Sequence, residues 1–302
     1  MCCCVALKTL YAQCPDRIVL RERILFLRSS TVSKGQQLDE LLPFSSRLEK
    51  CPLKNDSVRI LLLQRIGALY YLVGKYSEAV SYTESAIDIL KGSNTTYTDP
   101  LFLTTVYNYF QLYYDSLKLV NEKMNAIDSC IHYALLINEI NDQTLYNVWQ
   151  RTAYALEIGD FQRCVNYASI GETLAEKYAM PIDSLEFMQN FFNYRMVALT
   201  EMNQLEIADK EIRNKINEYK KLEQEKLCGT FYNQLSAIAI RQQKFDSALF
   251  ALKNSFRCNQ EEGYIIGIKQ CLNNIGYFYL NYLNDPQIAL RYVRKALKYK
   301  TT

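Results

Sequence analysis

The sequence has few residues that break helices, since only 10 glycines and 6 prolines occur among 302 residues. An all-β protein needs a turn about every 8–12 residues, and such turns are rich in both residue types. The scarcity of glycine and proline therefore excludes an all-β fold and predicts long helices.

Neither sign of charge dominates, and no long apolar run is present. The 35 Lys and Arg and 32 Asp and Glu leave a net charge of +3, and the isoelectric point of about 8.2 lies below the value of about 9 that is typical of nucleic-acid-binding domains. The most basic stretch, residues 291–300, is expected to be the polar outer face of a terminal capping helix. No apolar run approaches the roughly 18 residues of a transmembrane helix. We expect neither a nucleic-acid partner nor a membrane span.

Residues for catalysis are scarce. The single histidine is His132, and Cys130 lies two positions away, on another helical face, so the two cannot form a nucleophile–base pair. Phosphate-binding glycine loops, zinc-protease helices and nucleophile elbows are all missing. Four carboxylates at helical spacing are expected on solvated faces: Glu84, Asp88, Glu172 and Glu176. The sequence predicts no enzyme, no catalytic residue, no metal site and no cofactor.

The ten cysteines do not form a metal-binding pattern. Cys2, Cys3 and Cys4 are contiguous, which is not the spacing of a zinc knuckle. Five others stand singly in helical patterns and are expected to be small buried hydrophobic residues: Cys130, Cys164, Cys228, Cys258 and Cys271. Cys14 and Cys51, each followed by proline, are the candidate disulfide pair, and a disulfide requires export. Whether they pair stays open at this point.

The N-terminal residues 1–13 leave two alternatives. Their apolar start and small residues resemble the end of a Bacteroidetes-type signal peptide whose beginning has been clipped. The segment lacks a basic n-region, so a frayed cytosolic N-terminus is the alternative. Export to the periplasm is favoured over a cytoplasmic location.

An internal repeat is the strongest signal in the chain. In residues 60–90, Gly67 and Tyr70 lie three positions apart, Gly74 marks a turn, and Ala79 and Ala86 follow seven positions apart. The same pattern recurs at the C-terminal end, with Ile275, Gly276, Tyr279, a turn near Asn284, Ala289 and Ala296. Each copy predicts two antiparallel helices joined by a tight turn.

These residues resemble the tetratricopeptide (TPR) motif, in which small residues let paired helices approach closely. The resemblance implies that Tyr70, Tyr113 and Tyr279 lie in the core. Turns inside the pairs are expected near Gly74, Leu117, Gly159, Asn203, Gln243 and Asn284. Their spacing of 40–44 residues exceeds the usual TPR period of about 34. The sequence is therefore similar to a long-helix TPR protein; HEAT repeats have this longer period but lack the signature.

The predicted fold is all-α, a right-handed superhelical solenoid of about six antiparallel helix pairs in residues 57–302. An atypical capping pair, with helices at 16–28 and 36–50, is expected within residues 14–56. Helix-start signals support these boundaries: Asp56-Ser57, Asp99-Pro100, Ile182-Asp183 and Asp285-Pro286.

The N-terminal part also resembles the TPR arm that precedes a CHAT caspase-like peptidase domain in Bacteroidetes proteins. The resemblance is carried by the stretches LYAQCPDR, QQLDELLPF and KNDSVRILLLQRIGALYYLVGKYSEAV. The CHAT domain itself is not visible after Tyr299, so the sequence is either a truncated chain or a free-standing arm, and the resemblance carries over no peptidase activity.

A column of polar and aromatic residues is expected to line the groove formed by the first helices. Two and three positions before the aligned glycine, every pair supplies an Asn or Gln, whose amide offers both donors and an acceptor to a peptide backbone. The predicted groove residues are Gln64, Tyr107, Asn108, Trp149, Gln150, Asn193, Tyr194, Asn233 and Asn273. The alternative is an ordinary solvated face.

The predicted function is a scaffold that binds a protein or peptide in this groove and localises or regulates an effector. The alternative is a sensor or regulatory arm of a signalling protein, or of a CHAT-type peptidase, whose output domain lies outside this chain. Fold alone does not decide between them.

Overall fold

The computed structural model describes residues 14–51, 56–92, 100–138, 140–177 and 183–299. Across these residues the secondary structure consists of fourteen α-helices and one 3-10 helix, and they contain no strand. The chain divides into two compact units, Met1–Asn147 and Val148–Thr302, with the boundary inside a helix and not in a linker. The all-α prediction is confirmed.

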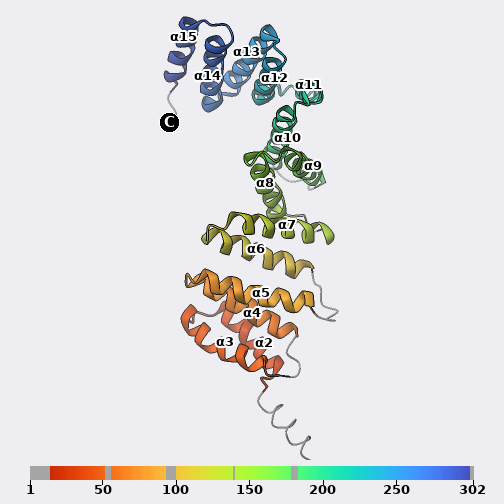
Figure 1. The fold of residues 1–302 in the computed structure, drawn as a ribbon, viewed down its shortest axis with the longest axis vertical. Coiled ribbons are helices and arrows are strands. Elements are labelled where there is room, and N and C mark those ends of the chain that lie inside the picture. The colour runs from red at the N-terminus through yellow and green to blue at the C-terminus, as the bar shows by residue number, and fades with distance from the viewer. Residues whose placement is uncertain (1–13, 52–55, 93–99, 139, 178–182, 300–302) are drawn as a thin grey trace, which may run out of the picture. The chain divides into compact units, whose positions relative to one another are not determined.

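The first unit contains three complete helix pairs. Its helices are α2 (Arg17–Ser29), α3 (Lys34–Leu48), α4 (Ser57–Leu72), α5 (Tyr76–Gly92), α6 (Pro100–Ser116), α7 (Val120–Leu136) and the beginning of α8 (Asp142–Glu157). Figure 1 shows α4 beside α5 and α6 beside α7, and these pairs pack along their lengths.

The second unit continues the same alternation. Its helices are the rest of α8, α9 (Phe161–Lys177), α10 (Asp183–Glu201), α11 (Leu205–Lys221), η1 (Glu225–Cys228), α12 (Gly229–Arg241), α13 (Phe245–Glu262), α14 (Ile265–Asn281) and α15 (Pro286–Leu297). We call the first helix of each pair the A helix and the second the B helix. In this unit A helices also pack against one another, α10 against α12 and α12 against α14.

Left-handed residues mark the turns inside the pairs. Positive φ angles occur at Gly74, Lys118, Gly159, Asn203, Gln243 and Asn284. Five of these are the predicted turn residues, and the sixth lies one position after the predicted Leu117. Glycine adopts this conformation without strain, and asparagine also tolerates it, as at Asn203 and Asn284. Lys118 and Gln243 adopt a conformation that their residue types rarely have.

Asp side chains cap three of the helices whose starts the sequence predicted. Asp16 accepts hydrogen bonds from the backbone N–H groups of Ile18 and Val19. Asp56 and Asp285 cap α4 and α15 in the same way. Each cap satisfies donors that have no partner within the helix, so these boundaries are set by local chemistry.

Small residues allow the paired helices to approach, as the TPR resemblance implied. Ala79 and Ala86 on α5 are fully buried, as is Tyr113 on α6, which has 1% of its surface exposed. Ala289 and Ala296 are buried in the same manner on α15. Tyr70 and Tyr279 are partly buried and pack against core clusters. The predicted core is therefore confirmed at both ends of the array.

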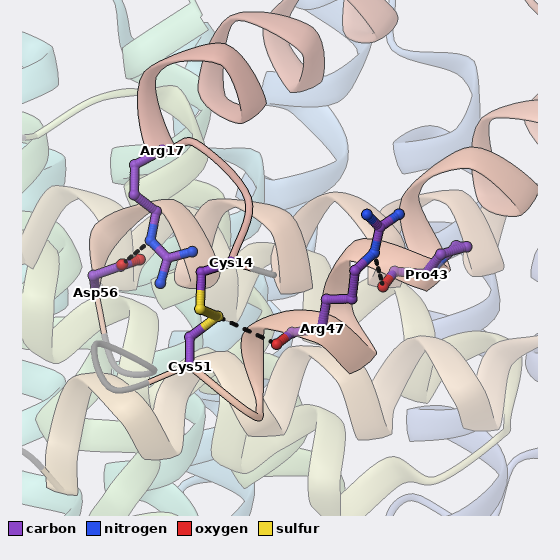
Figure 2. The surroundings of a disulfide bond; sticks show 6 residues. All are labelled: Cys14, Arg17, Pro43, Arg47, Cys51 and Asp56. Carbon is purple, nitrogen blue, oxygen red and sulfur yellow. Dashed lines mark hydrogen bonds and ion pairs between the residues drawn. A yellow bond between two sulfur atoms is a disulfide. The ribbon is translucent and has the colours of Figure 1, made fainter. Parts of the chain in front are cut away.

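A disulfide joins Cys14 to Cys51 and ties the start of α2 to the residues after α3 (Figure 2). The two Cα atoms lie 5.9 Å apart, within the range that a disulfide spans. Beside it, Arg17 forms an ion pair with Asp56 at 2.5 Å. The disulfide thus joins the two ends of the capping pair, and the ion pair joins this pair to the start of α4. Cys2, Cys3 and Cys4 lie outside the described residues.

The five single cysteines are buried free thiols, which confirms their predicted packing role: Cys130, Cys164, Cys228, Cys258 and Cys271. Burial raises the pKa of Cys130 to about 12. The pKa of Cys164 is raised to about 11, mainly by burial. Such thiols stay protonated at neutral pH and are poor nucleophiles.

Two expectations about polar faces were wrong. Glu172 is not on a solvated face; its carboxylate is bonded to Arg195 at 3.0 Å, and burial raises its pKa above the usual range. The outer face of α15 is not wholly polar, because Leu290, Val293 and Leu297 are exposed along it. The spacing of charged residues along the chain does not show which side chains of neighbouring helices contact them.

The described helices do not include one that is both long and apolar enough to cross a membrane. Within the same residues, His, Cys, Asp and Glu do not gather into a group of three or more that could hold a metal ion. His132 is exposed, and its ring makes a T-shaped contact with that of Tyr133, with 5.1 Å between the centroids.

Candidate functional site: the face of the A helices

The predicted column of amides forms hydrogen bonds between successive A helices of the second unit. Gln234 on α12 donates from Nε2 to the backbone oxygen of Asn193 on α10 at 3.2 Å, and to its side-chain oxygen at 3.4 Å. Asn274 on α14 donates from Nδ2 to Oδ1 of Asn233 on α12 at 2.8 Å. We call these four residues the amide ladder.

A third contact, one to two turns further along the helices, has the same spacing as the ladder. Arg241 on α12 donates to the backbone oxygen of Thr200 on α10 at 3.1 Å and forms an ion pair with Glu201. In this contact and in the ladder, the donor Gln234, Asn274 or Arg241 lies 41 residues after its acceptor. α12 and α14 therefore each meet the preceding A helix with an offset of one repeat, which aligns equivalent positions across the face.

The ladder fixes how each acceptor amide is oriented. The Oδ1 atoms of Asn193 and Asn233 face the next A helix, where they accept a hydrogen bond. Their Nδ2 groups donate to no group within the described residues. Since an amide carries two donors besides its acceptor oxygen, the ladder leaves a spaced row of N–H donors on half-buried side chains.

Asn273 completes the row on α14. Its side chain is exposed, and it has no hydrogen bond to any of the described residues. Tyr277, one turn further along α14, exposes 60% of its surface. Ile266 and Leu280 on α14 are also exposed by half or more. An aromatic ring beside amide donors offers both flat contact area and hydrogen bonds to a peptide.

The remaining predicted residues lie elsewhere. Asn108 accepts from Asn147 at 3.3 Å within the first unit, which is a similar contact between A helices. Gln64, Trp149 and Gln150 are half-buried on their helices.

Two predicted groove aromatics are packing residues. Tyr107 turns towards the B helices, where Lys91 donates to its hydroxyl at 2.9 Å and Tyr133 stacks on its ring. Tyr194 packs against a core cluster around Ala155 and Cys164. A position two or three residues before the aligned glycine therefore does not ensure exposure on the A-helix face.

Sequence reasoning missed Tyr277, Ile266 and the Arg241–Glu201 pair. The signal for the pair was present, because opposite charges stand 40 positions apart at matching places in two repeats. Tyr277 and Ile266 lie outside the two aligned positions that were compared, although both have the spacing of one helical face with Asn273.

No protein-family model matches the sequence, and no curated protein does either. Solved structures do resemble it. The apo form of RapI is 13% identical, with a TM-score of 0.53 over 92% of this chain and 75% of that one. The C-terminal part of a TPR repeat-containing protein from Cytophaga hutchinsonii is 13% identical, with a TM-score of 0.45 over 89% of this chain and 96% of that one. A tetratricopeptide repeat protein from Parabacteroides merdae is 12% identical, with a TM-score of 0.33 over 93% and 99% of the two chains.

The likeness to RapI concerns the fold. Together with the helix pairs, the buried small residues and the left-handed turns, it defines this chain as a TPR-like array of helix pairs. The longer period reflects helices of mostly 16–19 residues in the pairs after the capping pair, as in α4, α5 and α10.

Proposed function

We propose that the chain binds an extended segment of a partner protein on the A-helix face of α10, α12 and α14, and thereby localises or regulates an effector. The observation that carries this proposal is the amide ladder. It holds the amides of Asn193 and Asn233 in one orientation and leaves their N–H groups available. Backbone carbonyls of an extended peptide are suitable acceptors for such donors, and they are independent of the peptide's sequence.

The ladder also determines which variants test binding without loosening the fold. Replacing Asn193 and Asn233 by Asp retains the acceptor oxygens for Gln234 and Asn274 and removes the N–H donors. A matched control, Asn214→Asp with Gln260→Glu, adds the same charge at exposed positions of α11 and α13. Both double variants are expected to melt within a few degrees of the wild type.

The test is a pull-down from lysate of the parent organism, with chemical cross-linking and mass spectrometry. We expect the wild type and the Asn214→Asp/Gln260→Glu control to retain a partner that cross-links near α10, α12 or α14. The Asn193→Asp/Asn233→Asp variant is expected to lose it. Equal retention by all three chains, or cross-links confined to the B helices, would reject the A-helix face as the binding site.

A sensor arm is the second candidate, including the arm of a CHAT-type peptidase. It shares the peptide-binding face and adds a change in curvature when the face is filled. Small-angle scattering of the chain with and without the captured partner separates the two, because a sensor changes its radius of gyration and a simple scaffold does not.

Export to the periplasm remains part of the proposal. The Cys14–Cys51 disulfide supports it, since disulfides persist in oxidising compartments. Acid-quenched alkylation of cells should find Cys14 and Cys51 blocked to alkylation if the chain is exported, and alkylated if it stays in the cytosol.

A further inference from the structure

A second recessed surface lies between the B helices α11 and α13 of the second unit, above α12. It has a volume of about 540 Å³. Arg213, Lys220 and Arg257 line it together with a single carboxylate, that of Glu225. The lining has three positive groups against one negative group, but Asp209 already pairs with Arg213 through hydrogen bonds of 2.7 and 3.0 Å. Lys220, Arg257 and Glu225 then leave a net charge of +1, which favours an anionic ligand.

A carboxylate of the chain itself already lies in this pocket. Glu225, on the short helix η1, accepts from Arg257 at 2.9 Å and from the hydroxyl of Tyr232 at 3.2 Å. The ammonium group of Lys220 lies 3.6 Å from the same oxygen. Burial raises the pKa of Tyr232, so its hydroxyl remains a donor at neutral pH. Two hydrogen-bond donors and one further cation thus converge on one carboxylate oxygen.

One aromatic side chain that lines the pocket is exposed to solvent. Phe250 on α13 exposes 68% of its surface, although it lines the same pocket as the cationic groups. Asn217 and Asn254 add amides from α11 and α13. An anion with an apolar neighbour in a partner's sequence would match both features.

The first unit has a pocket at the corresponding place, with the opposite charge. It lies between α5 and α7 above α6 and has a volume of about 360 Å³. Lys91 and Tyr107 there correspond to Lys220 and Tyr232, but the charged lining consists of Glu84, Asp88 and Glu122 against Lys91, a net charge of −2. The position of the pocket follows from the repeat, whereas its charge does not.

The groove between α9 and α11 has a different set of charged contacts. There Arg195 on α10 bonds Glu172 on α9 at 3.0 Å and Glu211 on α11 at 2.5 Å. This network occupies the position between the B helices with its own side chains. The open basic pocket over α12 is therefore specific to its residues.

We infer that the pocket of α11, α12 and α13 binds an anionic side chain of a protein partner, which replaces Glu225 on Arg257 and Lys220 while its apolar neighbour packs on Phe250. The anion is a carboxylate or a phosphate, because both accept from the same donors. This site is separate from the A-helix face and does not depend on the function proposed for that face.

The probes are three blocked peptides, Ala-Gly-X-Phe-Gly-Ala, in which X is Glu, phosphoserine or Gln. Each is titrated into the ¹⁵N-labelled full chain and followed by amide chemical shifts. We expect the Glu or phosphoserine peptide, or both, to shift amides of α11, η1 and α13, and the Gln peptide to bind at least fivefold more weakly. If only one of the two anionic peptides binds, its carboxylate or phosphate is the anion that the pocket recognises. Equal binding of the Gln peptide, or no shift in these helices, overturns the inference.

Variants separate a binding role from a structural one. Glu225→Gln removes the negative charge that competes for the pocket and is expected to lower the dissociation constant of the anionic peptide at least threefold. Arg257→Glu is expected to abolish binding, whereas Lys253→Glu, with the same charge change at an exposed site of α13, has no effect. An unchanged or weakened affinity for Glu225→Gln contradicts the displacement. The Asn193→Asp/Asn233→Asp variant should bind these peptides normally, so failure here and failure of the A-helix face are distinguishable.

Discussion

At the scale of single residues, Gly67 decides how closely α4 and α5 approach. A Cβ atom on Gly67 would lie 2.4 Å from Oγ1 of Thr83 and 3.0 Å from the backbone oxygen of Ala79. Thr83 is itself fully buried and donates to that same oxygen at 2.8 Å, so it cannot move aside freely. The glycine of the TPR signature is thus required here by contact, and the sequence pattern predicted its role correctly.

We predict that Gly67→Ala lowers the free energy of unfolding by about 1–3 kcal/mol, because overpacking outweighs the gain in helix propensity. Gly35→Ala is the matched control, since a Cβ atom there meets nothing within 4 Å in α3. It should be neutral or stabilising by up to about 1 kcal/mol. Urea unfolding monitored by circular dichroism measures both. A Gly67→Ala variant as stable as the wild type would contradict the close approach.

The buried thiol of Cys130 predicts a loss of stability in alkali. Its ordinary pKa of 9.0 is raised to about 12 by burial. Because the unfolded thiol ionises first, its contribution is fully present below pH 9 and is lost as the pH rises towards 12. The Cys130 thiol lowers the free energy of unfolding by at most about 1.4 kcal/mol per pH unit in this range. Unfolding of wild type and Cys130→Ala between pH 8 and 11 tests this prediction, and equal slopes would refute it.

At the scale of elements, the sequence predicted the helix pairs and their turns because those depend on local chemistry. Asp caps, turn residues with positive φ and small residues seven positions apart are all visible along the chain. The partners of polar side chains depend on neighbouring helices 40 residues away, and these could not be predicted. For this reason the sequence did not reveal the hydrogen bonds between the amides of successive A helices, and it gave Tyr107 and Glu172 surroundings other than those they have.

The amide ladder should appear as an energetic coupling between α12 and α14. A double-mutant cycle of Asn233→Ala and Asn274→Ala is expected to give an interaction energy of about 0.5–1.5 kcal/mol, the usual net value of a hydrogen bond. Asn214→Ala combined with Asn274→Ala should be additive, since Asn214 is an exposed residue of α11. Chemical denaturation measures both cycles, and additivity in the first would argue against the ladder.

The disulfide should stabilise the capping pair. Cys14 and Cys51 are separated by 37 positions, and closing a loop of this size typically contributes about 2–4 kcal/mol. We expect reductant to lower the unfolding midpoint of the wild type and to leave the Cys14→Ser/Cys51→Ser variant unchanged. If reductant affects both proteins alike, the effect does not come from this bond.

At the scale of the molecule, the chain is a TPR-like array in which each helix is stabilised mainly by its neighbours. The sequence predicted six pairs and a capping pair, and the structure has seven pairs in the described residues. It did not predict the two compact units, because their boundary lies within α8 and no linker marks it. Two recessed surfaces of opposite charge at equivalent places also escaped the sequence analysis, since charge at one position of a repeat is meaningful only once its neighbours are known.

The central claim is that a partner segment binds across α10, α12 and α14, and hydrogen–deuterium exchange tests it most directly. Exchange is compared for the full chain alone and with the partner identified by the pull-down. The account predicts slower exchange in these three A helices, and none of this protection in the Asn193→Asp/Asn233→Asp variant. Protection confined to α11 and α13, or the same protection in wild type and variant, would contradict recognition by the A-helix face.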